Sequence, residues 1–211
     1  MNRNEKINTN IKIFYITLTI GSMLLYIPVN RLVTGGCSLA ISFDNLIPLV
    51  PVFVIPYLFG IVFWIFSIIF INLKGNKKYA IRFTVMMILA GILSVIIYIV
   101  FPTFVVRPEV VGTDIFSSLI KLVYINDNVY NAAPSGHTFY TVICLIGLYK
   151  LLSRYRFLLT TISILIILST LFTKQHNLLD VVTGLLFALG IYFLSNFLLM
   201  HKKSRHSAKA I

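Results

Sequence analysis

Long runs of apolar residues, separated by shorter polar connections, dominate the pattern of hydrophobic and polar positions along this chain. A helix needs about 20 apolar residues to cross the hydrocarbon core of a membrane. We therefore predict six membrane-spanning helices, at residues 12–28, 51–73, 80–101, 135–152, 157–173 and 178–200. The fourth and fifth are at the lower limit of length, which is acceptable where a helix end lies in a water-filled cavity inside the protein.

Two long connections, at residues 29–50 and 102–134, fall on the same side of the predicted helices. The second contains a stretch from Thr113 to Tyr124 with apolar residues at helical spacing, namely Ile115, Phe116, Leu119, Ile120 and Val123. This pattern predicts an amphipathic helix that lies in the membrane interface. The pattern is compatible with a packing lid and with a surface for lipid entry.

Composition supports a membrane protein, since the 211 residues are 58% hydrophobic and only 11% charged. A soluble domain needs far more charge to cover its surface. The composition thus excludes that class and predicts one all-α, polytopic membrane domain over residues 1–211. Cys37 falls in a connection and Cys144 in an apolar segment, so we expect neither a disulfide nor a cysteine metal site.

The distribution of charge predicts the orientation of the chain. With the N-terminus in the cytoplasm, 14 of the 18 Lys and Arg residues fall on the cytoplasmic side, and five of the six acids, all but Glu5, fall outside. This pattern obeys the positive-inside rule and predicts a multi-pass protein of the cytoplasmic membrane with both termini inside. Residues 201–211 then form a basic cytoplasmic tail. Topology and anionic lipid account for the net charge of +12, so we expect no nucleic-acid partner.

Candidate chemistry lies at the outer ends of the apolar segments, within residues 102–137 and 169–180. It consists of Arg107-Pro108, Pro134-Ser135-Gly136-His137, His176 and Asp180. Each of these motifs alone is weak evidence for an active site, since Pro-Ser-Gly is a common turn before a helix and basic residues often flank a membrane span. Together they place two imidazoles, a carboxylate and a guanidinium on one side of the membrane. Ionisable groups at a membrane-buried site are functional by default, so this set predicts an extracytoplasmic active site.

These residue types suit the transfer of a phosphoryl group without a metal. If the last helix begins just before His176, Asp180 lies on the same face one turn later. A carboxylate bonded to one ring nitrogen leaves the other nitrogen free to attack phosphorus, which predicts a phosphohistidine intermediate. His137 is the candidate general acid for the leaving oxygen.

Hydrogen-bond donors must stabilise the negative charge on the phosphoryl oxygens. The backbone N–H groups of Ser135, Gly136 and His137 fall at a predicted helix N-terminus, where free amides and the helix dipole favour an anion. Gly136 leaves room for a close approach. Arg107 offers a planar fork for two phosphate oxygens.

These motifs resemble the type 2 phosphatidic acid phosphatase superfamily, the membrane relatives of the vanadium haloperoxidases. That superfamily has the motifs Lys-x6-Arg-Pro, Pro-Ser-Gly-His and Ser-Arg-x5-His-x3-Asp. The second motif is complete here, the first keeps Arg107-Pro108, and the third keeps Ser169, His176 and Asp180. Three further stretches resemble a branch that includes inositol phosphotransferase-like members: Asp44 to Pro51, Asp127 to Asn131, and Thr173 to His176.

The resemblance implies a six-helix bundle of the haloperoxidase type with an interfacial helix in its outer loop. It also implies that His176 is the nucleophile, Asp180 its partner and His137 the acid, with Arg107 and Ser135 on the phosphate. Two cations of the superfamily motifs are missing, because Val100 and Thr170 occupy their positions. Lys174 is the candidate replacement for one of them, and a solvated loop charge is the alternative reading.

We therefore expect a metal-independent membrane lipid phosphatase that needs no cofactor. Its substrate would be a lipid phosphate with a phosphomonoester or diphosphate headgroup. Fewer cations weaken the binding of a doubly charged phosphate, so a lipid phosphotransferase of the sphingomyelin or inositol phosphorylceramide synthase type is the first alternative. A non-catalytic six-helix scaffold or transporter is the second.

Overall fold

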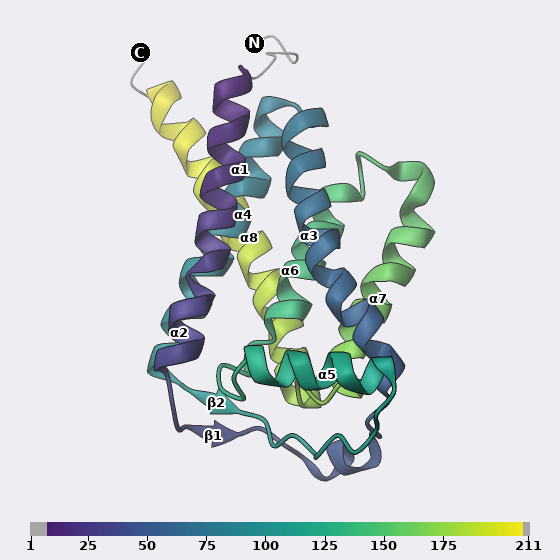
Figure 1. Cartoon of the computed structure of the whole chain (residues 1–211). Coiled ribbons are helices and arrows are strands. Elements are labelled where there is room, and N and C mark those ends of the chain that lie inside the picture. Colours follow the sequence, from purple (N-terminus) through teal and green to yellow (C-terminus); the bar gives the residue numbers. More distant parts are fainter. Residues whose placement is uncertain (1–7, 209–211) are drawn as a thin grey trace.

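The structure is a computed structural model that describes residues 8–208 of the chain. Most of these residues are helical (Figure 1). In chain order the helices are α1 (Thr9–Leu24), α2 (Tyr26–Leu32), α3 (Val54–Lys74), α4 (Lys77–Val100), α5 (Ile115–Asn126), α6 (Gly136–Leu148), α7 (Arg156–Phe172) and α8 (Leu178–Ala208). Two short strands, β1 (Cys37–Ser38) and β2 (Thr103–Phe104), and three 3-10 helices, η1 (Ser42–Leu46), η2 (Pro51–Phe53) and η3 (Ser153–Tyr155), complete the described elements.

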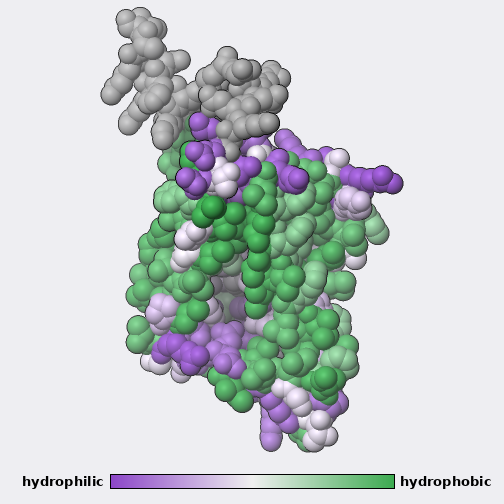
Figure 2. Space-filling view, turned by 45° about the horizontal axis from the view of Figure 1, so that its top comes forward, coloured by the Kyte–Doolittle hydropathy of each residue, from purple (hydrophilic) through white to green (hydrophobic). Residues whose placement is uncertain are grey.

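The long helices form a bundle with α6 at its centre. Helices α1, α3, α4, α6, α7 and α8 run roughly along one axis, while α5 lies across one end of them (Figure 1). Both ends of the described chain lie at the other end of the bundle. Figure 2 shows a broad hydrophobic flank between polar groups at the two ends. An apolar surface of this extent is typical of contact with a membrane.

Five helical segments are long and apolar enough to span a membrane: Thr9–Leu32, Pro51–Lys74, Lys77–Val100, Ser153–Phe172 and Leu178–Leu199. Helix α6 has only 13 residues, which is about 20 Å of helix against a hydrocarbon core of about 30 Å. The predicted span over residues 135–152 is therefore too long at its C-terminal end, since α6 ends at Leu148. A short helix is sufficient here because α3, α4, α7 and α8 contact α6 on its different sides.

The predicted all-α membrane bundle is confirmed, although two boundaries move. The first apolar segment continues to Leu32, with a break at Leu25, instead of ending near residue 28. Pro28 is the third residue of α2, where its missing N–H has no intrahelical partner to lose. Helix α8 continues to Ala208, so it includes much of the predicted tail, whereas residues 209–211 lie outside the described residues.

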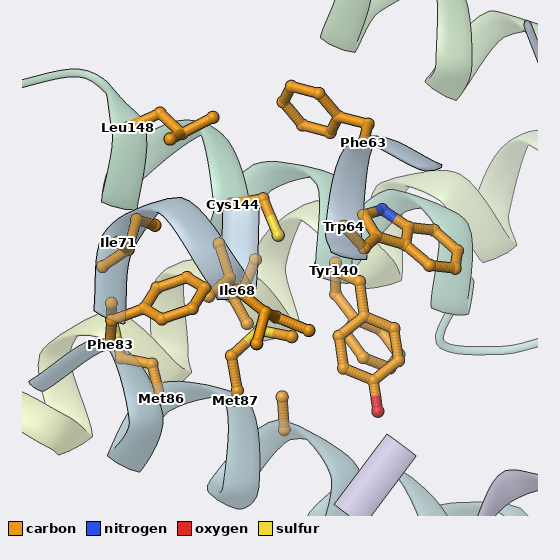
Figure 3. Close-up of a cluster of buried hydrophobic side chains, with 14 of the residues drawn as sticks. Phe63, Trp64, Ile68, Ile71, Phe83, Met86, Met87, Tyr140, Cys144 and Leu148 are labelled. Carbon is orange, nitrogen blue, oxygen red and sulfur yellow. The ribbon is translucent and has the colours of Figure 1, made fainter. Parts of the chain in front are cut away.

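One cluster of buried hydrophobic side chains holds α3, α4 and α6 together (Figure 3). It includes Trp64 and Ile68 from α3, Phe83 and Met87 from α4, and Cys144 from α6. The indole N–H of Trp64 also donates a hydrogen bond of 3.0 Å to the hydroxyl of Thr141 on α6. The central helix is therefore fixed both by apolar packing and by a buried hydrogen bond.

The predicted amphipathic helix is confirmed as α5, shifted by two residues. Its N-cap Asp114 accepts hydrogen bonds from the N–H groups of Phe116 and Ser117 and from the Ser117 hydroxyl. These bonds, chiefly those from Ser117, lower the pKa of the Asp114 carboxyl. Ile120 is buried against Val54 and Val110. The apolar side chains on its outer side, Ile115, Leu122 and Ile125, stay exposed.

Two short strands join the two outer connections, a feature with no signal in the sequence pattern. Strands β1 and β2 pair in parallel, with Cys37 opposite Thr103 and Ser38 opposite Phe104. Phe104 also forms an isolated antiparallel bridge with Tyr130. The segment that precedes α6 is thereby attached to both connections.

Helices α1 and α4 approach closely at Gly91, which generates a testable prediction. A Cβ atom at this position would lie 2.6 Å from the carbonyl oxygen of Ser22 in α1. Gly91→Ala should therefore push the helices apart and cost about 1–3 kcal/mol, seen as a lower Tm of the purified protein in detergent.

The control is Gly21→Ala in α1, where an added Cβ meets nothing within 4 Å. That variant should be as stable as the wild type or slightly more stable, because Ala favours a helix over Gly by about 1 kcal/mol. Equal Tm values for Gly91→Ala and the wild type would show that α1 does not pack tightly on α4.

Candidate active site

A cavity of about 130 Å³ lies inside the bundle at the end where α6 and α8 begin. Its walls come from α1 to α4 and α6 and from the segments that precede α6 and α8. The polar residues on it include Asp127, Asn131, His137 and His176. Because about 10–15 Å³ of such space holds one water, the cavity has room for a group of several heavy atoms. Two imidazoles that are far apart in sequence, those of His137 and His176, therefore line one cavity.

Helix α6 carries the first imidazole into this cavity. His137 is the second residue of α6, and its ring stacks on that of Tyr57 with centroids 4.0 Å apart. The ring of Trp64 approaches edge-on at 4.8 Å. These two aromatic side chains of α3 hold the imidazole in place. Its Nε2 atom is buried and has no hydrogen-bond partner in the protein.

Ser135 caps α6 and connects it to α8. Its hydroxyl oxygen accepts hydrogen bonds from the N–H of Thr138, at 3.4 Å, and from the Thr138 hydroxyl, at 3.1 Å. Its own N–H donates to the carbonyl of Asp180 at 3.0 Å. The helices can approach this closely because a Cβ on Gly184 would lie 2.9 Å from the Ser135 carbonyl oxygen. Gly136, the first residue of α6, lines the cavity.

The second imidazole lies in the turn between α7 and α8. The N–H groups of Gln175 and His176 both donate to the carbonyl of Thr170, at 3.0 and 3.1 Å, so this turn folds back on the end of α7. Lys174, in the same turn, has a left-handed φ of 54°. The hydroxyl of Tyr124 donates to the carbonyl of Thr173 at 2.8 Å, and burial raises the pKa of Tyr124 to about 12.

Helix α8 begins at Leu178, where the last span was predicted to begin, so the condition for a shared helix face of His176 and Asp180, a start just before His176, is not met. The carboxylate of Asp180 accepts a hydrogen bond of 2.7 Å from the N–H of Asn177, as a residue in the first turn of a helix often does for the capping position. Asp180 Oδ2 nevertheless lies 3.9 Å from His176 Nδ1. This distance is too long for a hydrogen bond, and both His176 Nδ1 and Asp180 Oδ1 are buried without a partner.

Asp44 fixes the start of α8 from the first outer connection. One oxygen of its buried carboxylate accepts from the N–H of Leu178 at 2.8 Å, and the other accepts from the N–H of Ile41 at 2.8 Å. Its backbone carbonyl accepts from the ammonium group of Lys174 at 2.9 Å. Lys174 therefore points to this connection, and it is not among the residues that line the cavity.

Arg107 holds the second outer connection to the histidine turn. Its guanidinium donates to the backbone carbonyls of Asp127 and Asn128 at 2.8 and 3.0 Å, and to the Gln175 amide oxygen at 2.6 Å. It also lies over the ring of Tyr124, 4.8 Å from the centroid. Arg107 does not line the cavity, and its Nε atom is buried without a partner. In this structure its guanidinium supports the loops around the cavity.

Sequence reasoning assigned no role to Asp127, which lines the cavity with the imidazoles. Its carboxylate accepts a hydrogen bond of 2.7 Å from the hydroxyl of Tyr26 and a longer one, of 3.5 Å, from that of Tyr57. The only signal in the sequence was the resemblance of the stretch from Asp127 to Asn131 to one branch of a superfamily. Within residues 8–208, no three His, Cys, Asp or Glu side chains are grouped in a way that would hold a metal ion.

The fold and the cavity define an all-α membrane bundle with two histidines on one buried site. A family model described as the PAP2 superfamily, the type 2 phosphatidic acid phosphatases, matches residues 38–194. The chain therefore belongs to the PAP2 superfamily, a membership that supports phosphatase-like phosphoryl transfer. The matched region includes both histidines and every other predicted site residue. No curated protein and no solved structure matches the chain.

The contacts of Asp44 lead to a prediction about the histidine turn. Asp44→Ala removes the acceptors for the N–H groups of Leu178 and Ile41, so we expect a loss of about 1–2 kcal/mol in stability, as for other lost helix caps. Because the turn that carries His176 rests on Asp44, affinity for orthovanadate, a phosphate analogue, should also fall. Thermal unfolding and vanadate titration in detergent measure the two effects.

The matched control is Asp114→Ala, which removes the cap of α5 at a position that does not line the cavity. It should lower the Tm and leave the affinity for vanadate unchanged. An unchanged vanadate affinity in Asp44→Ala would contradict a role of Asp44 in positioning His176.

Proposed function

We propose that this protein is a membrane lipid phosphatase that hydrolyses a phosphomonoester or diphosphate headgroup without a metal. One observation carries the proposal: His137 and His176, from two separate segments, line the same cavity, and His137 Nε2 is buried there without a hydrogen-bond partner. Buried polar atoms nearly always have a hydrogen-bond partner in native proteins. An unpartnered nitrogen at a cavity is therefore expected where a polar ligand binds.

The proposed reaction has two steps. In the first, a ring nitrogen of His176 attacks phosphorus, the bond from phosphorus to the lipid oxygen breaks, and protonated His137 gives its proton to the leaving oxygen. In the second, water attacks the phosphohistidine, His137 accepts a proton from the water, and the bond between phosphorus and nitrogen breaks. Asp180 lies on the Nδ1 side of His176, which leaves Nε2 as the attacking atom and stabilises the ring when it is charged.

The N-terminus of α6 supports the binding of the phosphoryl oxygens. Four N–H groups at the start of a helix have no intrahelical acceptor, and those of Gly136 and His137 lie at the cavity, where the helix dipole also favours an anion. Ser135 contributes by capping this turn. We assign Arg107 and Lys174 to phosphate binding as well, although both would have to release carbonyl groups that they bind in the present structure.

The substrate is proposed to be a lipid because the cavity lies inside a bundle with a hydrophobic flank (Figure 2). The distribution of Lys and Arg supports insertion in the cytoplasmic membrane with both termini inside. Helices α6 and α8 begin at the end of the bundle opposite the described ends of the chain (Figure 1), and the cavity is lined by residues at and near these two helix starts. With this orientation the reaction takes place on the extracytoplasmic side.

A second candidate is a lipid phosphotransferase, in which a lipid hydroxyl replaces water in the second step. The observation that favours it is the charge of the cavity wall, where Asp127 contributes a carboxylate and the described lining residues include no Lys or Arg. A phosphodiester with one negative charge is repelled less by this carboxylate than a doubly charged phosphomonoester. Exchange of headgroup that depends on an added acceptor lipid would establish this function, whereas phosphate release without acceptor would establish hydrolysis.

The nucleophile and the acid can be tested with purified protein and a chelator. The wild type should release inorganic phosphate from phosphatidate, phosphatidylglycerol phosphate or a polyprenyl diphosphate, and His176→Ala should abolish this release. His137→Ala should slow a lipid substrate more than an activated aryl phosphate, since a general acid matters most when the leaving oxygen is basic.

The control is His206→Ala, which removes an imidazole from the predicted cytoplasmic tail and should leave turnover unchanged. No phosphate release from any of the three lipids would refute hydrolysis of this substrate class. Normal turnover in His176→Ala would refute the assignment of the nucleophile.

Asp180→Asn tests the partner of the nucleophile. The amide oxygen of Asn can still accept from the N–H of Asn177, so the start of α8 should fold normally. Loss of the negative charge near His176 should lower kcat by about 10²–10⁴-fold, as for the comparable change in a Ser-His-Asp triad. A wild-type Tm with a wild-type kcat would show that Asp180 acts only as a helix cap.

A further inference from the structure

Asn131 is a buried amide on the cavity wall with no partner for its side chain. Only 2% of the residue is exposed, and both its Oδ1 and its Nδ2 lack a hydrogen bond. It lines the same cavity as His137 and His176. A side-chain amide offers two donors and an acceptor, and leaving all of them unpaired in a protein interior is unfavourable.

The backbone of Asn131 is also in an unfavourable conformation. Its φ is 64°, in the left-handed region that residues other than Gly adopt rarely, although Asn tolerates it better than most. Strained backbone of this kind persists only where the surrounding structure holds it, and it is concentrated at functional sites. The unpaired amide and the backbone strain therefore occur at the same residue.

Hydrogen bonds on both sides of Asn131 hold it in this position. Before it, the carbonyl of Val129 accepts from the N–H of Val105 at 3.1 Å. After it, the N–H of Ala133 donates to the hydroxyl of Thr103 at 2.7 Å, and the carbonyl of Pro134 accepts from the hydroxyl of Tyr98 at 2.7 Å. The side chain is thus presented to the cavity by a segment that is anchored at both ends.

Four other side-chain donors on the cavity wall are already used inside the protein. The hydroxyl of Tyr26 donates to Asp127, the indole N–H of Trp64 to Thr141, and the hydroxyls of Ser94 and Tyr98 to the carbonyls of Gly91 and Pro134. The described lining residues include no Lys or Arg. A phosphoryl group in this cavity therefore meets few free donors, and the amide of Asn131 is one of them.

We propose that Asn131 is a substrate-binding residue whose Nδ2–H donates a hydrogen bond to a non-bridging oxygen of the phosphoryl group during transfer. This inference rests on the proposed phosphoryl-transfer function and adds a specific contact to it. Because the carboxylate of Asp127 on the same wall repels an anion, a phosphoryl group in this cavity depends on the hydrogen-bond donors that remain there. The amide thereby supplements the free N–H groups at the start of α6, in a chain that has Val100 and Thr170 in place of two motif cations.

The simpler alternative is that Asn131 is present only because Asn adopts a left-handed conformation easily. Asn131→Gly separates the two explanations, since Gly adopts this φ without strain and removes the amide. Asn131→Asp is the second variant, because it keeps the shape of the side chain and replaces the donor with a carboxylate. Asn126→Gly is the control, an asparagine at the end of α5 that does not line the cavity.

The experiment measures the Tm, the affinity for orthovanadate, and kcat and KM for phosphate release from whichever lipid the wild type hydrolyses. Asn131→Gly should keep the wild-type Tm, lose about 10²–10³-fold in kcat, as when one oxyanion donor is removed, and bind vanadate at least about tenfold more weakly. Asn131→Asp should lose more in both activity and vanadate affinity because it adds a charge that repels the anion. Asn126→Gly should match the wild type.

Wild-type kcat and vanadate affinity in either folded Asn131 variant would overturn the inference while leaving the proposed function intact. A wild type that neither releases phosphate nor binds vanadate would overturn both. Unfolding of Asn131→Gly would contradict the expectation that Gly adopts this backbone conformation without strain. In that case vanadate binding by Asn131→Asp decides whether the amide contacts the anion.

Discussion

The hydrogen bond from the N–H of Ser135 to the carbonyl of Asp180 joins the first turn of α6 to the first turn of α8. Each helix begins beside one of the two imidazoles, so this contact brings His137 and His176 to the same cavity. It forms only because Gly184 allows the helices to meet without a side chain between them. In a low-dielectric interior an unpaired N–H at this position would cost free energy. This hydrogen bond therefore strongly constrains the relative position of the two helices.

The outer connections complete the cavity by satisfying polar groups of the loops that carry the site. Asp44 accepts from the start of α8, and Arg107 donates to the backbone carbonyls of Asp127 and Asn128 as well as to Gln175 beside His176. The two residues thus connect segments that lie far apart in sequence. Among the residues that line the cavity, the buried atoms without a partner are His137 Nε2, His176 Nδ1 and the amide of Asn131. Unpaired polar atoms on a cavity wall, carried by loops that hydrogen bonds hold in place, are what a preorganised polar site requires.

Helix positions were largely predictable because a membrane span and an amphipathic helix both leave a periodic or continuous apolar signal. The predicted helix in the second connection is α5, and five predicted spans correspond to long apolar helices. The errors have physical causes. Helix α6 is shorter than predicted because its neighbours bury it. Helix α8 begins at the predicted residue 178, where Asp44 and Asp180 cap it, so His176 lies before the helix and shares no helix face with Asp180. Strands of two residues, such as β1 and β2, leave no pattern to detect.

The amino-acid sequence alone determined the class of this protein, since composition demands a membrane bundle and the motifs at residues 134–137 and 176–180 carry enough chemistry to indicate phosphoryl transfer. Only the tertiary structure decided which of the polar residues face the cavity. It turned Arg107 and Lys174 toward backbone carbonyls and brought Asp127 and Asn131 to the wall. The physical reason is that a buried donor takes an acceptor within reach in three dimensions, and the identity of that acceptor depends on loop contacts that no local pattern encodes.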